Sequence, residues 1–238
     1  MRWLLYALGA VAAAALVGAV LFPLSLALKL TDAPITGEPS GRLWDGRVEE
    51  AMVAGRALGL VEVRGAFLPL LRGAGRADIT VTGAAGRGSA TAEVSDGIAT
   101  LTGIDAVVPV APYGFEGPFG EPMTGTLRAE GRATLGPEGC REAAMTVSTD
   151  AMANAARRLG GQDLTLSGPV ACEDGVLVAR LAGRTGAGSA RALVRLRPGT
   201  YTTELTLDPA DARAGQALRR YGFRRAPDGY TVVTRGSY

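Results

Sequence analysis

The stretch Ala77-Asp78-Ile79-Thr80-Val81-Thr82 alternates apolar and polar side chains with a period of two residues. This period is typical of a β-strand that turns one face to a core and the other to water. The run from Gly83 to Gly88 follows at once and supplies the small residues that a hairpin turn requires. The stretch therefore predicts two antiparallel strands joined by a tight turn.

The same alternation recurs along most of the chain. Further predicted strands contain Val61–Arg64, Ala92–Val94, Ile98–Thr102, Gly125–Glu130, Val176–Leu181, Ala192–Leu196, Tyr201–Leu207 and, at the end, Tyr230–Val233. Turn signals such as Asp96-Gly97, Asp174-Gly175 and Pro198-Gly199 separate them. Aromatic residues make up only 5% of the chain, so any core is built mainly from aliphatic side chains. We therefore predict a mainly β fold, an extended and curved antiparallel sheet.

Two stretches indicate helices. Ala151 to Leu159 is rich in alanine, and Pro209 to Tyr221 has helix signals at both ends. Asp208 is placed to cap the second stretch, Pro209 suits the first helical position, and Gly222 is placed to end the helix. We expect a short helix near the C-terminus.

The N-terminus predicts a membrane anchor. No charged side chain occurs from Trp3 to Leu28, and Trp3–Phe22 would form a helix roughly 30 Å long, about the thickness of a bilayer core. A cleaved signal peptide, with Ser25-Leu26-Ala27 as its cleavage site, and a buried core helix are the alternatives. Arg2 favours an N-terminus in the cytoplasm and the rest of the chain outside it.

This pattern divides the chain into a transmembrane anchor at 1–30, a tether at 31–40 and a β-rich domain at 41–238. Gly41-Arg42-Leu43-Trp44-Asp45-Gly46 opens that domain as a tight bend, and Trp44 is interpreted as its structural anchor, with a binding role as the alternative.

A pattern of spaced glycines suggests an internal repeat. Gly37-Glu38-Pro39 recurs as Gly120-Glu121-Pro122, and Gly83–Ala92 resembles Gly183–Ala192. Glycine and alanine are common in this chain, so chance recurrence is the alternative. A true repeat would give two lobes, about 41–119 and 120–238.

The chain has two cysteines, Cys140 and Cys172, and no histidine. Two thiols alone do not make a zinc site, which usually needs four ligands. Beyond a membrane anchor, in an oxidising compartment, we expect a disulfide between them. Two unpaired buried thiols are the alternative.

The composition excludes most catalytic machinery. Without histidine there is no Ser-His or Cys-His pair, and Lys29 is the only lysine, so the domain has no P-loop lysine. We expect no enzyme activity, no cofactor and no metal. Net charge is +2, and the group of Arg219, Arg220, Arg224 and Arg225 is too small and poor in aromatics for a nucleic-acid surface.

In order, these features resemble the protein N family of the type II secretion system. Gly41, Leu43, Trp44 and Gly46 resemble the family's Gly-x-Leu/Val-Trp-x-Gly motif. Pro69, Leu71 and Gly73 resemble its proline-leucine-glycine stretch, and the late cysteine pair is also similar. The chain departs from the family at Val61 and Val63, on a strand where the family often carries a second tryptophan.

The resemblance implies a role in the machine that moves folded proteins from the periplasm across the outer membrane. It also implies kinship with AsmA-like envelope proteins, which have a β-groove and are associated with lipid transport. The leading hypothesis is a non-catalytic, single-pass inner-membrane subunit with its bulk in the periplasm, acting through contacts with other secretion components. The alternative is a lipid-binding β-groove protein of the envelope.

Overall fold

The computed structural model describes residues 23–25, 35–42, 44–53, 56–66, 75–113, 122–158 and 164–237. The predicted anchor lies outside these residues except for Pro23–Ser25. Leu43, Pro69, Leu71 and Gly73 of the predicted family motifs also lie outside them. Within the described ranges, no helix has both the length and the apolar character needed to cross a membrane.

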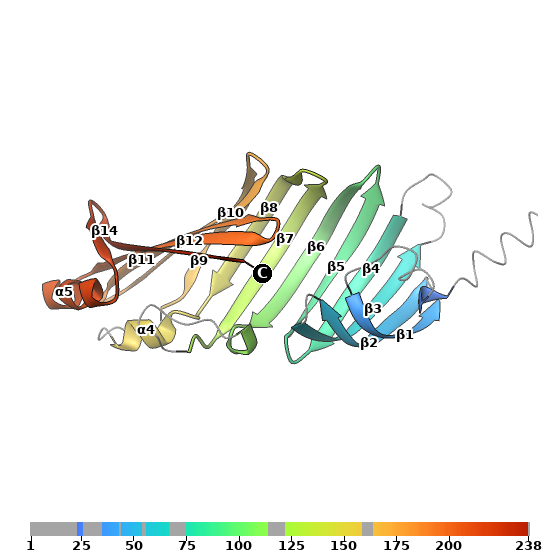
Figure 1. Cartoon of the computed structure of the whole chain (residues 1–238), viewed down its shortest axis with the longest axis horizontal. Helices are drawn as coiled ribbons and strands as arrows, with labels where there is room; N and C mark the ends of the chain where they lie inside the picture. The colour runs from blue at the N-terminus through green and yellow to red at the C-terminus, as the bar shows by residue number, and fades with distance from the viewer. Residues whose placement is uncertain are drawn as a thin grey trace, which may run out of the picture.

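Fourteen described strands form one antiparallel sheet (Figure 1), which confirms the predicted mainly β fold. The strands follow one another in chain order, except that β14 lies between β12 and β13. Their bounds are β1 (Ile35–Arg42), β2 (Asp45–Val53), β3 (Arg56–Ala66), β4 (Gly75–Gly83), β5 (Gly86–Ser95), β6 (Ile98–Pro109), β7 (Thr126–Gly136), β8 (Gly139–Thr149), β9 (Leu166–Glu173), β10 (Val176–Thr185), β11 (Gly188–Arg197), β12 (Thr200–Pro209), β13 (Arg224–Ala226) and β14 (Gly229–Ser237).

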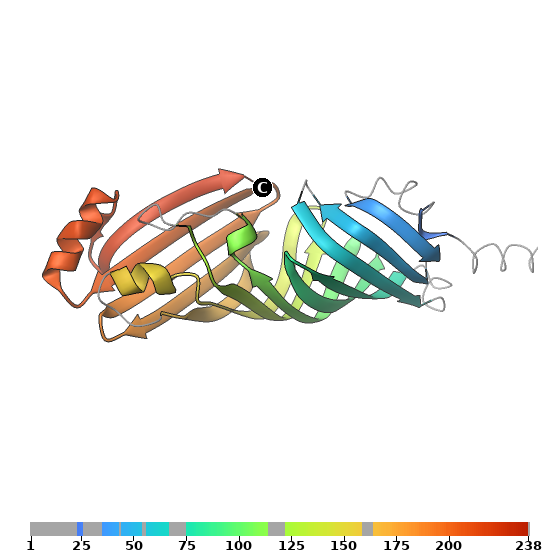
Figure 2. The ribbon, with the colours of Figure 1, turned by 90° about the horizontal axis from the view of Figure 1, so that it is seen from below.

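The sheet is an open trough rather than a flat layer or a closed barrel. Figure 2 shows its middle strands at the bottom of the curve, with β1 rising at one border and β14 at the other. Strand twist and bulges both bend a sheet in this way. A register shift between Leu101 and Ile104 marks one such bulge in β6. Gly103 lies inside it with φ +60°, a conformation that costs glycine little.

The first strand begins within the stretch predicted as a tether. Residues 35–40 were expected to belong to an irregular tether, but they form most of β1. Glycine and proline are tolerated there because β1 is an edge strand, where one side of the backbone needs no partner.

The helices are short. η1 (Ala111–Tyr113) follows β6, α4 (Ala153–Arg158) lies within the predicted alanine-rich stretch, and α5 (Ala212–Arg220) lies near the C-terminus. The predicted start of α5 was wrong: Asp211 caps it by accepting a hydrogen bond from the Arg213 N–H at 2.8 Å. Pro209 instead ends β12 opposite Gly188, because pairing with β11 continues to that residue.

The predicted internal repeat is not reproduced in strand register. Gly83 closes its hairpin by pairing with Gly86, whereas Gly183 lies inside its strand and pairs with Ala190. The sheet also runs on through the proposed boundary between lobes, since β6 pairs with β7. The division into two lobes remains a prediction.

Candidate functional site

The most extensive chemical feature of the fold is an apolar face that crosses the sheet from strand to strand. Cross-strand pairs join Ile79 to Ala90, Ala92 to Leu101, Leu101 to Ala133 and Ala129 to Val147. We call this side of the sheet the inner face. Along β4 to β8 it includes Ala77, Ile79, Val81, Ala90, Ala92, Val94, Ala99, Leu101, Ala106, Leu127, Ala129, Ala133, Leu135, Met145 and Val147.

Burial identifies this face as the concave side of the trough. Ala133 is only 6% exposed, while Arg132, its neighbour on the other face, is largely exposed and pairs with Glu142 at 3.1 Å. A second exposed pair, Arg76–Glu93 at 3.0 Å, lies on the same outer face. Neighbouring strands therefore shield the small inner side chains by curving around them, and the charges face solvent.

Part of the inner face is covered and forms the main core. Leu218 of α5, the nearby Phe223, and Met152 and Leu164 on either side of α4 belong to one buried cluster with residues of β7 to β12. A smaller cluster at the other end of the sheet contains Leu24, Val48, Ala51 and Val61. Between them, β4 to β6 contribute no fully buried side chain to either cluster, so the inner face is most open there.

One rim of the trough exposes apolar side chains. Val94 is 48% exposed and Leu135 is 39% exposed, and Ala99 pairs with both of them across β6. This row lies at the strand end that carries the β5–β6 and β7–β8 turns. We call it the apolar rim; sequence reasoning missed it because it joins residues of three strands.

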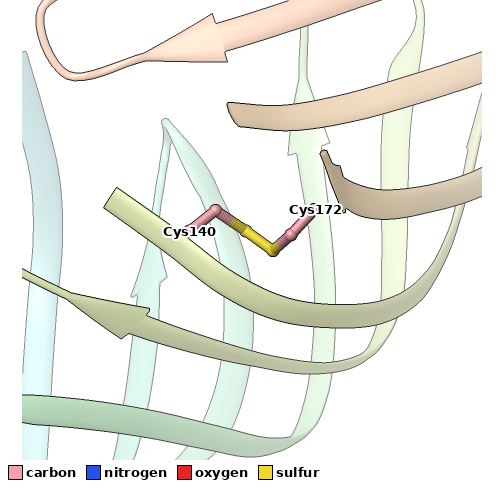
Figure 3. The surroundings of a disulfide bond; sticks show 2 residues. All are labelled: Cys140 and Cys172. Carbon is pink, nitrogen blue, oxygen red and sulfur yellow. A yellow bond between two sulfur atoms is a disulfide. The ribbon is translucent and has the colours of Figure 1, made fainter. Parts of the chain in front are cut away.

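A disulfide lies next to the apolar rim. Cys140 at the start of β8 is bonded to Cys172 near the end of β9, with Cα atoms 5.6 Å apart (Figure 3). Cys140 pairs with Leu135, and its N–H donates a hydrogen bond to the Gly175 carbonyl at 3.0 Å. The predicted disulfide is confirmed, and the alternative of two unpaired thiols is wrong.

Glu173, the residue after Cys172, has a carboxyl group whose pKa lies below its ordinary value. Arg180 holds the Glu173 carboxylate through both guanidinium nitrogens, one of them at 2.8 Å. This hydrogen bonding is the main cause that lowers the pKa of Glu173 below its ordinary value. Both side chains are about half exposed on the outer face, where water screens such pairs. The pair is a surface ion pair.

The predicted glycine-tryptophan motif builds the first turn of the sheet. Gly41 has φ +82°, which favours glycine, and Gly46 is buried under Leu24. The Trp44 carbonyl accepts a hydrogen bond from the Gly65 N–H at 2.8 Å, which ties the turn to the end of β3. The part of the motif that the structure describes therefore lies where β1, β2 and β3 meet, and its structural role remains a prediction.

Gly46→Ala is expected to lower the free energy of unfolding by about 1–3 kcal/mol, because an added methyl overpacks a closed site. A Cβ atom there would lie 2.6 Å from the Arg42 carbonyl oxygen and 2.7 Å from the Leu24 side chain. Urea unfolding followed by circular dichroism measures the change. Gly186→Ala is the matched control, since no atom lies within 4 Å of its Cβ position. Equal losses in the two variants would contradict this account of Gly46.

A small pocket lies beside α4. This pocket of about 40 Å³ lies between α4 and the β10–β11 turn, lined by Met152, Ala156, Leu164 and Leu207 among others. Within the described residues, no three His, Cys, Asp or Glu side chains gather as a metal site. The absence of a cofactor remains a prediction.

Residues 36–234 match the family described as Type II secretion system (T2SS), protein N. The chain belongs to the type II secretion system protein N family. The match runs from β1 to β14, so the family domain is the whole trough and includes Gly41, Trp44, Gly46 and the disulfide. No curated protein and no solved structure matches this family member.

Proposed function

We propose that this family member is a non-catalytic subunit anchored in the inner membrane. It holds its sheet in the periplasm, where the sheet contacts other secretion components. The observation that carries the proposal is the match of the entire trough to the family. An open sheet with two borders offers surface for contact with other proteins.

The anchor is supported by its connection to the sheet. Residues 3–22 carry no charge, and they lead into Pro23, which forms a β-bridge with Arg42 at the end of β1. Leu24 is buried against Gly46 and Val48. A membrane helix ending at Pro23 would therefore hold the turn end of β1 close to the bilayer.

The experiment is a secretion assay in cells that lack the protein. Full-length protein is expected to restore export, and crosslinking followed by detergent extraction is expected to recover known secretion subunits with it. A variant in which residues 1–22 are replaced by a cleavable signal sequence tests the anchor and keeps the packed residues Pro23 and Leu24. Full export by the variant without the anchor would contradict anchoring. Normal export by cells that lack the protein would contradict the proposed function.

The apolar rim favours a second candidate, a lipid-binding groove. Val94 and Leu135 expose apolar surface that continues onto the inner face, a surface that acyl chains could cover. Purified full-length protein would then yield bound phospholipid after solvent extraction. Leu135→Glu is expected to reduce the bound lipid severalfold, while Met52→Glu, at an exposed apolar site of similar accessibility away from the rim, leaves it unchanged. Lipid-free protein would contradict this candidate.

A further inference from the structure

The two borders of the sheet are unequal, and the border at β14 is only partly paired. β14 has nine residues, whereas its outer neighbour β13 has three. Their pairing ends at Arg224 opposite Thr231. From Val232 to Ser237, a length of roughly 20 Å, no described residue pairs with β14 on that side. Figure 2 shows this strand as the border that ends at the C-terminus.

The hairpin geometry indicates which backbone groups are free. A two-residue turn separates β13 from β14, and Ala226 pairs with Gly229 to close it. Such a closing pair exchanges hydrogen bonds, and backbone direction then alternates along the strand. The N–H and C=O groups of Val233, Arg235 and Ser237 therefore point away from β12, beyond the end of β13.

The sequence of this free run suits strand pairing. It contains no proline, and Val232-Val233-Thr234 favours extended structure. Val233 is 50% exposed, although it is a large apolar residue. The opposite border is protected: β1 contains Pro39, has an irregular register near Gly37, and is bridged by Pro23 at Arg42.

The charges around the free run are mainly basic. Arg235 lies on the run itself, and Arg224 and Arg225 lie on β13 beside it. Asp228 is already paired with Arg191 at 3.3 Å. Glu204 of β12 pairs with Val233 in the ladder, so it is the acidic group nearest to the edge. The excess of arginine favours an acidic partner and disfavours a second copy of the same edge.

We propose that the edge of β14 from Val232 to Ser237 binds an extended, acidic segment of a partner protein as an added strand. The main-chain groups of Val233 and Arg235 supply hydrogen bonds, and the arginines select acidic side chains. The proposal rests on the proposed function, since it assigns one surface of the trough to partner contact.

The direct test measures peptide binding to the full-length protein in detergent. The probe is a fluorescein-labelled peptide of about eight residues in which Val and Glu alternate, the length of an ordinary strand. Val233→Pro removes an outward N–H but leaves the groups that face β12. Val233→Pro is expected to weaken peptide binding about tenfold or more. Val233→Thr keeps the N–H, so its affinity is expected to stay within about twofold of that of the unaltered protein. Equal binding by the two variants, with both shown folded by circular dichroism, would overturn the proposal.

Reversing the charge at Arg235 and in the peptide tests whether the edge prefers an acidic partner. Arg235→Glu is expected to lower the affinity for the Glu peptide severalfold. It is expected to raise the affinity for a matched peptide in which Lys replaces Glu. A peptide N-methylated at alternate residues cannot complete the ladder and is expected not to bind. Preference of the unaltered protein for the Lys peptide would overturn the acidic specificity. Self-association that Val233→Pro abolishes, without any peptide binding, would overturn the proposal in favour of a second copy.

Export distinguishes this proposal from the function on which it rests. In cells that need the protein for secretion, the Val233→Thr variant is expected to restore export, and the Val233→Pro variant is expected to fail. Restoration by both variants overturns the edge proposal alone. Normal export without the protein overturns the proposed function, while the peptide measurements still decide whether the edge binds a strand.

Discussion

Opening the Cys140–Cys172 disulfide is expected to lower the free energy of unfolding by about 3–4 kcal/mol. The bond closes a loop with a sequence separation of 32 residues, and α4 lies inside that loop. Cross-linking limits the freedom of the unfolded chain, and most of the stabilisation arises there. Denaturant unfolding of the Cys140→Ala, Cys172→Ala double variant, compared with the oxidised protein, measures the change.

Reductant supplies the control for this measurement. It is expected to shift the unfolding midpoint of the natural protein toward that of the double variant and to leave the double variant unchanged. Because Cys140 is largely buried beside Leu135, alanine is preferred to serine as the replacement. An unfolding midpoint that does not respond to reductant would contradict a stabilising role for the bond.

Leu218→Ala is expected to cost about 2–5 kcal/mol of unfolding free energy, the range for removing a fully buried leucine. Leu218 is 0% exposed and joins α5 to the main core cluster, which includes Leu205, Leu207 and Phe223. The truncation leaves a cavity at the place where the helix covers the inner face. Urea unfolding of the full-length protein measures the loss.

The matched control is Leu135→Ala, the same chemical change at the exposed rim. Leu135 is 39% exposed, so its truncation is expected to cost less than about 1 kcal/mol. Losses of equal size at the two sites would show that α5 does not stabilise the trough through Leu218.

The strands of this protein are predictable from sequence because their signal is local. The alternation of apolar and polar side chains in Ala77–Thr82 can be recognised from adjacent residues alone, and the same holds for the turns. All four residues of the turns Asp96-Gly97 and Asp174-Gly175 have positive φ, from 50° to 78°. A two-residue turn that joins two strands in a tight hairpin requires this conformation. The disulfide was also predictable, since the chain has only two cysteines.

Helix boundaries were less predictable because two local signals compete near Pro209. Asp208 and Pro209 resemble a helix start, yet both residues pair with β11, at Ser189 and Gly188. The true cap, Asp211, carries the same chemical signal three residues later. Ladder hydrogen bonds with a distant strand therefore decided where α5 begins.

The sequence by itself determined the β class, the hairpin turns, the disulfide and the lack of histidine chemistry, since each depends on residue type or short spacing. Only the tertiary structure decided where the predicted curved sheet bends, which residues form the apolar rim, and that β14 lies between β12 and β13. These features depend on register between strands, on bulges that bend them, and on which edge remains unpaired. Val94, Ala99 and Leu135 form one row only because three strands align there, and no local pattern specifies that alignment.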